Sequence, residues 1–264
     1  MTKIKPALRI VTKFNVAVLP SEGSTFKRAR PINLSETGVC LRVGLQLETG
    51  QTVSLQMRLD DNSPTFEVSA RIVWTRIESE TRQRVCGLGF VDLPKDYRDL
   101  IRASVELASQ SLLTFLSEFP LFEDFSLDDC TSMLRIITRR HLKKREVLYY
   151  QDEDIPDLQG LFIVKEGLLS IYCGREHRAD RQLAVVSPGQ VFGESTLVSD
   201  EPFFTSVMAI NESTLLQVNK KGALRMRPES PELALKLMDV IAHTLHLRLG
   251  RTTRQLFSPI QPVG

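Results

Sequence analysis

The stretch FKRARPINLSETGVCLRV (residues 26–43) joins a dense basic run to a polar segment and then to alternating apolar residues. The alternation over GVCLRV predicts a strand with one buried face. The segment NLSETG (33–38) has the residue types of a turn. This part of the chain therefore predicts small β-structure with a polar turn beside concentrated positive charge.

The neighbouring segments extend the β-pattern over the first third of the chain. They are FNVAVL (14–19), TVSLQMRL (52–59), FEVSARIVWTRI (66–77) and CGLGFVDL (86–93). Their β-branched and aromatic residues suit a half-buried pleated surface. After Pro94 the period changes to the spacing of a helix, and its apolar stripe comprises Ile101, Val105, Ala108, Leu112 and Phe115.

The second half begins with a predicted helix, SLDDCTSMLRIITRR (126–140), for which Ser126 is the expected N-cap. A closing helix is predicted at about 231–256. Between the two helices, strands are predicted in five segments: REVLYYQ (145–151), LFIVKEGLLSIYC (161–173), RQLAVVSPGQVF (181–192), TSVMAI (205–210) and TLLQVN (214–219). We expect a mainly β fold with helices (α+β). The expected parts are a β-domain (1–96), a linking helix (97–117), a second β-domain (118–257) and a tail (258–264).

Composition fits a cytoplasmic globular protein. The 264 residues are 42% hydrophobic and 25% charged, with no apolar run long enough to span a membrane and no cleavable leader pattern. The four cysteines form no ligand cluster, so buried reduced thiols are expected rather than a disulfide or zinc framework: Cys40, Cys86, Cys130 and Cys173. Net charge is only +2, but residues 1–30 carry seven Lys and Arg against Glu22 alone, which favours an anionic partner.

The first half resembles the PilZ family, whose members carry an RxxxR element and a [D/N]xSxxG element on a small barrel. KPALR (5–9) and NLSETG (33–38) correspond to them, except that Lys5 stands where the first arginine is expected. The resemblance implies a six-stranded antiparallel barrel and cyclic di-GMP as ligand. The implied binding residues are Lys5, Arg9, Asn33, Ser35 and Gly38.

These residue types suit such a ligand, because guanidinium pairs with phosphate and stacks on flat rings, while an amide both donates to and accepts from a guanine edge. Lys5 supplies charge without the planar fork, so weaker binding is expected. An alternative stays open: Asn33 and Ser35 could only satisfy a turn, and Gly38 could only supply a positive φ. Trp74 could border the site or belong to the core.

Residues from about 119 to 256 resemble the cyclic nucleotide-binding domain of catabolite activator proteins and cyclic-nucleotide-regulated kinases. The resemblance rests on FPLFEDFS, on the strand series and on SPGQVFGE (187–194). It implies a jelly roll with flanking helices. It also implies a phosphate-binding cassette, in which Gly193, Glu194 and Ser195 open the pocket and Phe203 and Thr205 lie at its end.

Phe203 occupies the position of the cassette arginine, and a buried phosphate without its cation is costly. The pocket is therefore expected to bind cAMP or cGMP poorly, and packing, dimerisation or partner contact is the alternative role of this domain. The closing helix carries a three-and-four stripe that could pair with a partner helix or pack on its own domain: Leu233, Leu237, Val240, Thr244 and Leu247. Asp239, His243 and His246 are expected to form a solvated face rather than a metal site.

No P-loop, GxGxxG, GxSxG or HExxH motif is present in the sequence, so an enzyme is not expected, nor is a metal or redox cofactor. No helix-turn-helix is expected after the closing helix, which disfavours direct DNA binding. The sequence thus favours a bacterial second-messenger receptor that signals to a protein partner, with a homodimer through the closing helix as a further option. The alternatives are a structural protein with two empty ligand folds and a dual sensor of cyclic di-GMP and cAMP.

Overall fold

The chain divides into two compact units, Met1–Phe115 and Leu116–Gly264. A computed structural model describes residues 14–20, 25–77, 83–176 and 181–257. The division falls inside the predicted linking helix, which is observed as α1 (Lys95–Ser117). No helix in the described ranges is long and apolar enough to cross a membrane.

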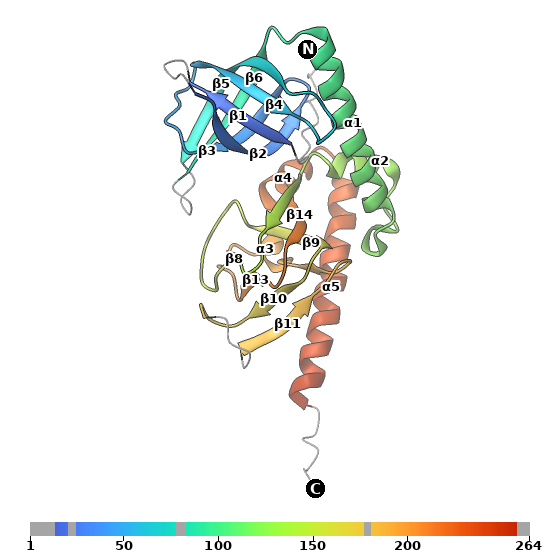
Figure 1. Ribbon diagram of the computed structural model, residues 1–264. Helices are drawn as coiled ribbons and strands as arrows, with labels where there is room; N and C mark the ends of the chain where they lie inside the picture. The colour runs from blue at the N-terminus through green and yellow to red at the C-terminus, as the bar shows by residue number, and fades with distance from the viewer. Residues whose placement is uncertain (1–13, 21–24, 78–82, 177–180, 258–264) are drawn as a thin grey trace. The chain divides into compact units, whose positions relative to one another are not determined.

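The first unit is a closed antiparallel barrel of six strands, as predicted (Figure 1). Neighbouring strands follow the order β1-β2-β3-β6-β5-β4, and β4 pairs with β1 to close the ring. The strands are β1 (Asn15–Leu19), β2 (Lys27–Ser35), β3 (Gly38–Val43), β4 (Thr52–Arg58), β5 (Phe66–Ile77) and β6 (Arg84–Val91). Five of these coincide with the alternating segments of the sequence.

The sixth strand, β2, corrects the sequence interpretation. The basic run and most of the polar segment form this strand, so Asn33 and Ser35 are strand residues and the turn consists only of Glu36 and Thr37. The pairing of β2 with β3 shifts register between Pro31 and Asn33. The basic run did not predict a strand, because its side chains are mostly charged and therefore do not alternate between apolar and polar residues.

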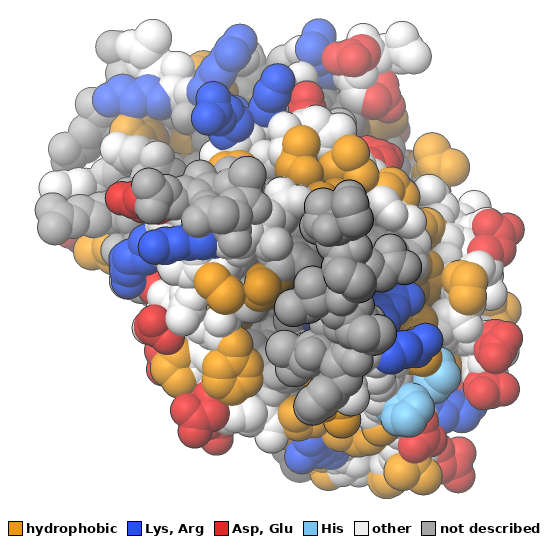
Figure 2. Space-filling model, turned by 90° about the horizontal axis from the view of Figure 1, so that it is seen from below, with side chains coloured by type: hydrophobic (Ala, Val, Ile, Leu, Met, Phe, Trp, Pro, Cys, Tyr) orange, Lys and Arg blue, Asp and Glu red, His pale blue; other side chains and the backbone are white. Residues whose placement is uncertain are grey.

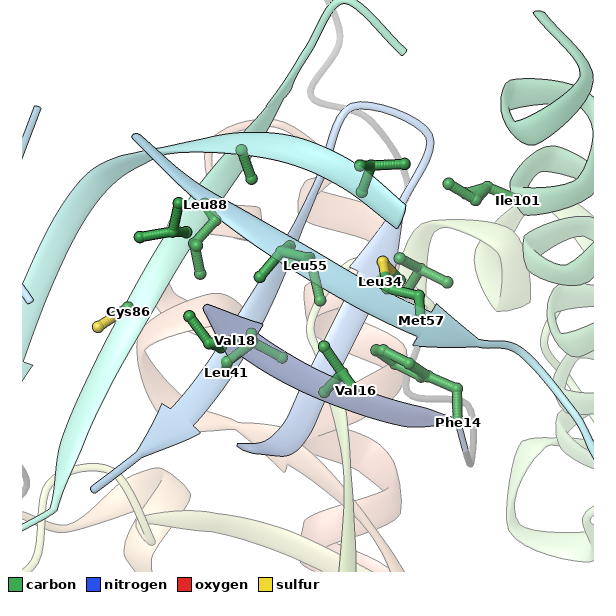
Figure 3. Packing of buried hydrophobic residues seen from close by; sticks show 14 of the residues in the cluster. Phe14, Val16, Val18, Leu34, Leu41, Leu55, Met57, Cys86, Leu88 and Ile101 are labelled. Carbon is green, nitrogen blue, oxygen red and sulfur yellow. The ribbon is translucent and has the colours of Figure 1, made fainter. Parts of the chain in front are cut away.

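One hydrophobic core fills the barrel. Alternate residues of each strand point inward, as Val39, Leu41 and Val43 do on β3. Ile101 and Val105 of α1 join the same cluster, and Figure 3 shows Ile101 directed toward the barrel interior beside Leu34 and Met57. The first three positions of the helical stripe predicted from the sequence, Ile101, Val105 and the partly buried Ala108, thus pack on the barrel.

The second unit contains two four-stranded antiparallel sheets, as expected for a jelly roll. Their orders are β11-β10-β13-β8 and β12-β9-β14-β7. The strands are β7 (Ile137–Leu142), β8 (Val147–Tyr149), β9 (Gly160–Glu166), β10 (Leu169–Tyr172), β11 (Gln182–Val186), β12 (Val191–Phe192), β13 (Ser206–Ala209) and β14 (Ser213–Asn219).

Helices flank these sheets: η1 (Pro120–Phe122), α2 (Leu127–Met133), α3 (Ser195–Val198), α4 (Lys220–Met226) and α5 (Pro231–Phe257). Ser126 caps α2 in a capping box with Asp129, as its sequence predicts. However, α2 ends at Met133, residues 134–136 form a turn, and residues 137–140 of the predicted helix belong to β7. ITRRHL pairs over its own whole length with β14, so sheet pairing overrides the helical pattern.

The predicted stripe of α5 is mostly buried within the chain. Leu233, Leu237, Val240 and Thr244 are nearly inaccessible, whereas Leu247 is 45% exposed. The four buried positions therefore pack on the protein itself and do not form a free seam for a partner helix.

The cysteine prediction is correct at three of four positions. Cys40, Cys86 and Cys130 are buried free thiols, and burial raises the pKa of Cys86 and Cys130. Cys173 is free but exposed, because it follows the end of β10.

Truncation of Ile101 tests the packing of α1 against the barrel. Ile101 is fully buried, so Ile101→Ala should lower the free energy of unfolding by about 2–5 kcal/mol. Leu107→Ala on the same helix is the matched control, because Leu107 is 70% exposed. Denaturant unfolding is followed by fluorescence of Trp74, the chain's single tryptophan, which lies in the barrel. Equal midpoints for the two variants would contradict this packing.

Candidate functional site

A pocket of about 180 Å³ opens on the outer face of the barrel. Its lining includes Asn33, Ser35 and Gly38, three of the residues expected from the sequence. Trp74 and Gly87 also line the pocket. The structure thus brings the polar segment of β2 together with the tryptophan of β5.

The registers of three strand pairs explain why these residues meet. Asn33 lies opposite Cys40, Cys40 opposite Gly87, and Gly87 opposite Trp74. These four residues form one row across β2, β3, β6 and β5, which we call the pocket row. Since neighbouring strands lie about 4.8 Å apart, the row spans roughly 14 Å from Asn33 to Trp74.

The side chains of Ser35 and Asn33 differ in their hydrogen bonding. The Ser35 hydroxyl is buried and donates to the carbonyl oxygen of Gly38 at 3.1 Å, which stabilises the hairpin. The Asn33 side chain makes no hydrogen bond to any residue in the described ranges, although it is half-buried in the pocket wall. The turn-stabilising alternative therefore describes Ser35 and not Asn33.

Gly38 is required by strand packing. A Cβ at this position would lie 2.2 Å from the carbonyl oxygen of Leu88 on β6. Gly38 is not among the described residues with positive φ, so the alternative based on a left-handed turn is wrong. Its missing side chain lets β3 and β6 approach each other at the pocket floor.

Trp74 borders the pocket and is only partly buried. Its indole lies directly against Gly87, where a Cβ would be 2.2 Å from Nε1. The guanidinium carbon of Arg76 lies 5.7 Å from the indole ring centroid. An aromatic ring held in this way offers a flat surface at the opposite end of the pocket row from the polar groups of Asn33.

The two basic residues expected at this site, Lys5 and Arg9, lie outside the described residues. Their part in the site stays a prediction. The described pocket therefore comprises the second sequence element and the strand residues opposite it.

The predicted cassette of the second unit follows β12. Gly193 has a φ of 79°, and a Cβ there would lie 2.8 Å from the carbonyl oxygen of Gly160. Glu194 is buried, and Ser195 begins α3. Thr205 is half-buried at the far end of the segment.

Phe203 is part of the hydrophobic core. It is 4% exposed and stacks on Tyr149, with ring centroids 3.8 Å apart and an interplanar angle of 9°. Burial raises the pKa of Tyr149 well above its usual range, and nearby Glu194 adds to this effect. Phe204 is 63% exposed, whereas Phe203 points inward. Phe203 thus fills the core at the position where the cassette arginine is expected.

Both regions match known domain families. Residues 8–107 match the family model of the PilZ domain, and residues 139–229 match that of the cyclic nucleotide-binding domain. The chain combines these two domains. The resemblances noted in the sequence are confirmed at this level.

Individual relatives are similar to the cyclic nucleotide-binding domain. The Cyclic AMP receptor protein of Thermus thermophilus is 25% identical over 137 residues, which are 52% of this chain and 58% of that protein. The crystal structure of the Thermus thermophilus Catabolite Activator Protein is 26% identical, with a TM-score of 0.42, over 53% of this chain and 63% of that one. A cyclic nucleotide-binding domain from Methylobacillus flagellatus is 14% identical, with a TM-score of 0.46, over 59% and 85%. The chain thus spans less than two thirds of the first two relatives.

A cation from outside the cassette contacts its glutamate. Arg248 of α5 forms an ion pair with Glu194, with Nη1 2.6 Å from Oε1, and its Nη2 donates to the carbonyl oxygen of Val191. The Glu194 side chain is 3% exposed, and its Oε2 has no hydrogen-bond partner among the described residues. Sequence reasoning missed Arg248 because it lies 54 residues from Glu194.

The residues considered as a metal site lie on the surface. Asp239, His243 and His246 are exposed on α5, and Figure 2 shows histidine side chains at the surface beside acidic ones. In the described part of the chain, no group of three His, Cys, Asp or Glu side chains is arranged to hold a metal ion.

A side chain at Gly87 tests the placement of the indole. Gly87→Ala should displace Trp74 toward solvent, shift its emission to longer wavelength and destabilise the PilZ domain by about 1–3 kcal/mol, because the new Cβ overlaps the ring. Gly89→Ala is the control, since its Cβ would meet Val73 Cγ2 at an ordinary 3.5 Å. Unchanged emission in Gly87→Ala would contradict this geometry.

Removal of Arg248 tests the ion pair of the cyclic nucleotide-binding domain. Arg248→Ala leaves the buried Glu194 carboxylate without its cation and should destabilise this domain by about 2–4 kcal/mol; the figure lies at the low end of the range for buried pairs because Arg248 is partly exposed. Arg251→Ala, at an exposed position of the same helix, should have little effect. Adding Glu194→Gln to Arg248→Ala should restore part of the loss. Differential scanning calorimetry measures all variants, and equal stability of the two arginine variants would show that the pair contributes little.

Proposed function

We propose that the protein is a cytoplasmic receptor for cyclic di-GMP. The ligand binds the PilZ domain, and the protein passes the signal to a protein partner. The observation that carries the proposal is the pocket row, in which Asn33 and Trp74 stand at opposite ends of a floor of small side chains. Asn33 has hydrogen-bonding groups that no described residue uses. The pocket thus offers a polar edge reader and an aromatic surface.

The chemistry of the ligand fits these groups. A guanine edge presents donors and acceptors that an amide can meet, and its flat face can stack on an indole. Gly38, Gly87 and Gly89 bring backbone rather than side chains to the floor, so a flat ring can approach closely. Arg9 and Lys5 would supply the charge for the phosphates.

The cyclic nucleotide-binding domain is proposed to act without a cyclic nucleotide of its own. Phe203 stacks in the core where a phosphate would need a cation, and Arg248 already pairs with Glu194, the glutamate of the expected cassette. A cyclic phosphate would have to break this pair or remain without a counter-charge. The domain would therefore relay the signal through its surface to an unidentified protein.

Both matched families are regulatory binding domains, which supports a receptor and not an enzyme. We propose that no metal or redox cofactor takes part and that the output does not involve direct DNA binding. Two other functions remain as outcomes of the test: a structural protein with two empty ligand folds, and a dual sensor that also binds cAMP.

Calorimetric titration of the purified chain with cyclic di-GMP tests the proposal. Wild type should bind, and Asn33→Ala should weaken binding roughly 10-fold, as expected for the loss of hydrogen bonds in a partly buried site. Asn62→Ala is the matched control, because Asn62 is exposed and bonds Asp60 through its backbone, which alanine retains. Arg9→Ala should weaken binding as strongly as Asn33→Ala.

The same preparation is titrated with cAMP, for which little binding at micromolar concentration is expected. Absence of heat and of thermal shift with cyclic di-GMP would favour the structural alternative. Tight binding of both nucleotides would favour the dual sensor and overturn the proposal that the second domain works without a nucleotide.

A further inference from the structure

A row of arginines lies beside the pocket row on the outer face of the PilZ barrel. Arg30 of β2 lies opposite Arg42 of β3, Arg42 opposite Val85 of β6, and Val85 opposite Arg76 of β5. Arg42 is two residues from Cys40, and Arg76 is two residues from Trp74. We call this set the arginine row.

Strand alternation places the two rows on the same face. On β3, Val39, Leu41 and Val43 belong to the core, so Cys40 and Arg42 point outward. Residues two apart on a strand are separated by roughly 7 Å. The pocket lining includes none of the arginines, so they border the pocket row from outside the pocket, and their side chains are long enough to meet the part of a ligand that extends beyond this row.

The two rows hold three guanidinium groups and no carboxylate. We infer that Arg42 and Arg76 bind a phosphate group of the ligand, with Arg30 adding positive potential at the edge. This inference rests on the proposed function, because it takes cyclic di-GMP as the ligand. It assigns phosphate recognition to the barrel wall in addition to the segment with Lys5 and Arg9.

The position of Arg76 supports this assignment. Its guanidinium carbon is 5.7 Å from the Trp74 ring centroid, so the cation lies beside the aromatic surface proposed for a guanine. In a nucleotide, the phosphate is joined to the base through one sugar, so a base at Trp74 brings its phosphate within reach of this row. A guanidinium binds phosphate with two parallel hydrogen bonds, which lysine cannot do.

The inference also accounts for a departure in the sequence. Lys5 stands where an arginine is expected, and the pair Arg42 and Arg76 supplies the planar groups that Lys5 lacks. The chain would thereby retain charge-assisted phosphate recognition with one arginine fewer in the first element.

Cyclic di-GMP titration of arginine variants tests the inference. Arg42→Ala and Arg76→Ala should each weaken binding roughly 10-fold or more, and the affinity of each should fall less steeply with rising salt than that of wild type. Arg76→Lys should recover only part of the loss, because it restores charge without the fork. Arg58→Ala is the control, since Arg58 lies on β4, outside both rows, and pairs with Asp61.

The outcomes separate this inference from the proposed function. If wild type binds and Asn33→Ala weakens binding while Arg42→Ala and Arg76→Ala do not, the arginine row is not a phosphate site and the receptor proposal stands. If Arg58→Ala weakens binding as much as the row variants, a general positive field replaces the specific site. If wild type does not bind, both proposals fail. Trp74 emission and the unfolding midpoint verify that each variant is folded, and Arg42→Lys with Arg76→Lys serves in place of any alanine variant that is not.

Discussion

Closure of the barrel by the pairing of β1 with β4 is the constraint on which the PilZ domain depends. A closed sheet has no free edge, and every strand residue faces either the core or the outside. Once the core takes Val39, Leu41 and Val43, the intervening residues of β3 must face outward, where the pocket lies. A slip of one residue would exchange the core and the face that carries the pocket.

Much of this arrangement could be predicted from the sequence, because it depends on local periodicity. The strands with clear alternation, the N-cap at Ser126 and the helix that packs Ile101 on the barrel all follow from patterns within a few residues. The strand β2 could not be recognised in the same way, since its outward side chains are charged and its register shifts near Pro31. The predicted end of α2 was wrong, because the residues that follow α2 pair with the distant strand β14.

The candidate sites show the same limit. Asn33, Ser35 and Gly38 were identified from one short element, whereas the role of Trp74 as a pocket wall required the register of β5 with β6. Likewise, the sequence alone showed that Phe203 stands where the cassette arginine is expected. Its stack on Tyr149 and the ion pair of Arg248 with Glu194 could not be predicted, because they join residues far apart in the chain. Long-range contacts of this kind leave no periodic signal in a single sequence.

The tight approach of β3 to β6 at Gly38 bears on how sequence elements of this type are interpreted. Any side chain there would overlap the carbonyl oxygen of Leu88, so the glycine is required for the barrel to form whether or not a ligand binds. The Ser35 hydroxyl, bonded to Gly38, is similarly tied to the hairpin. Two of the three defining residues of the element would thus persist in a protein that had lost its ligand. On the function proposed above, Asn33 is the position among them whose identity best separates a binding barrel from an empty one.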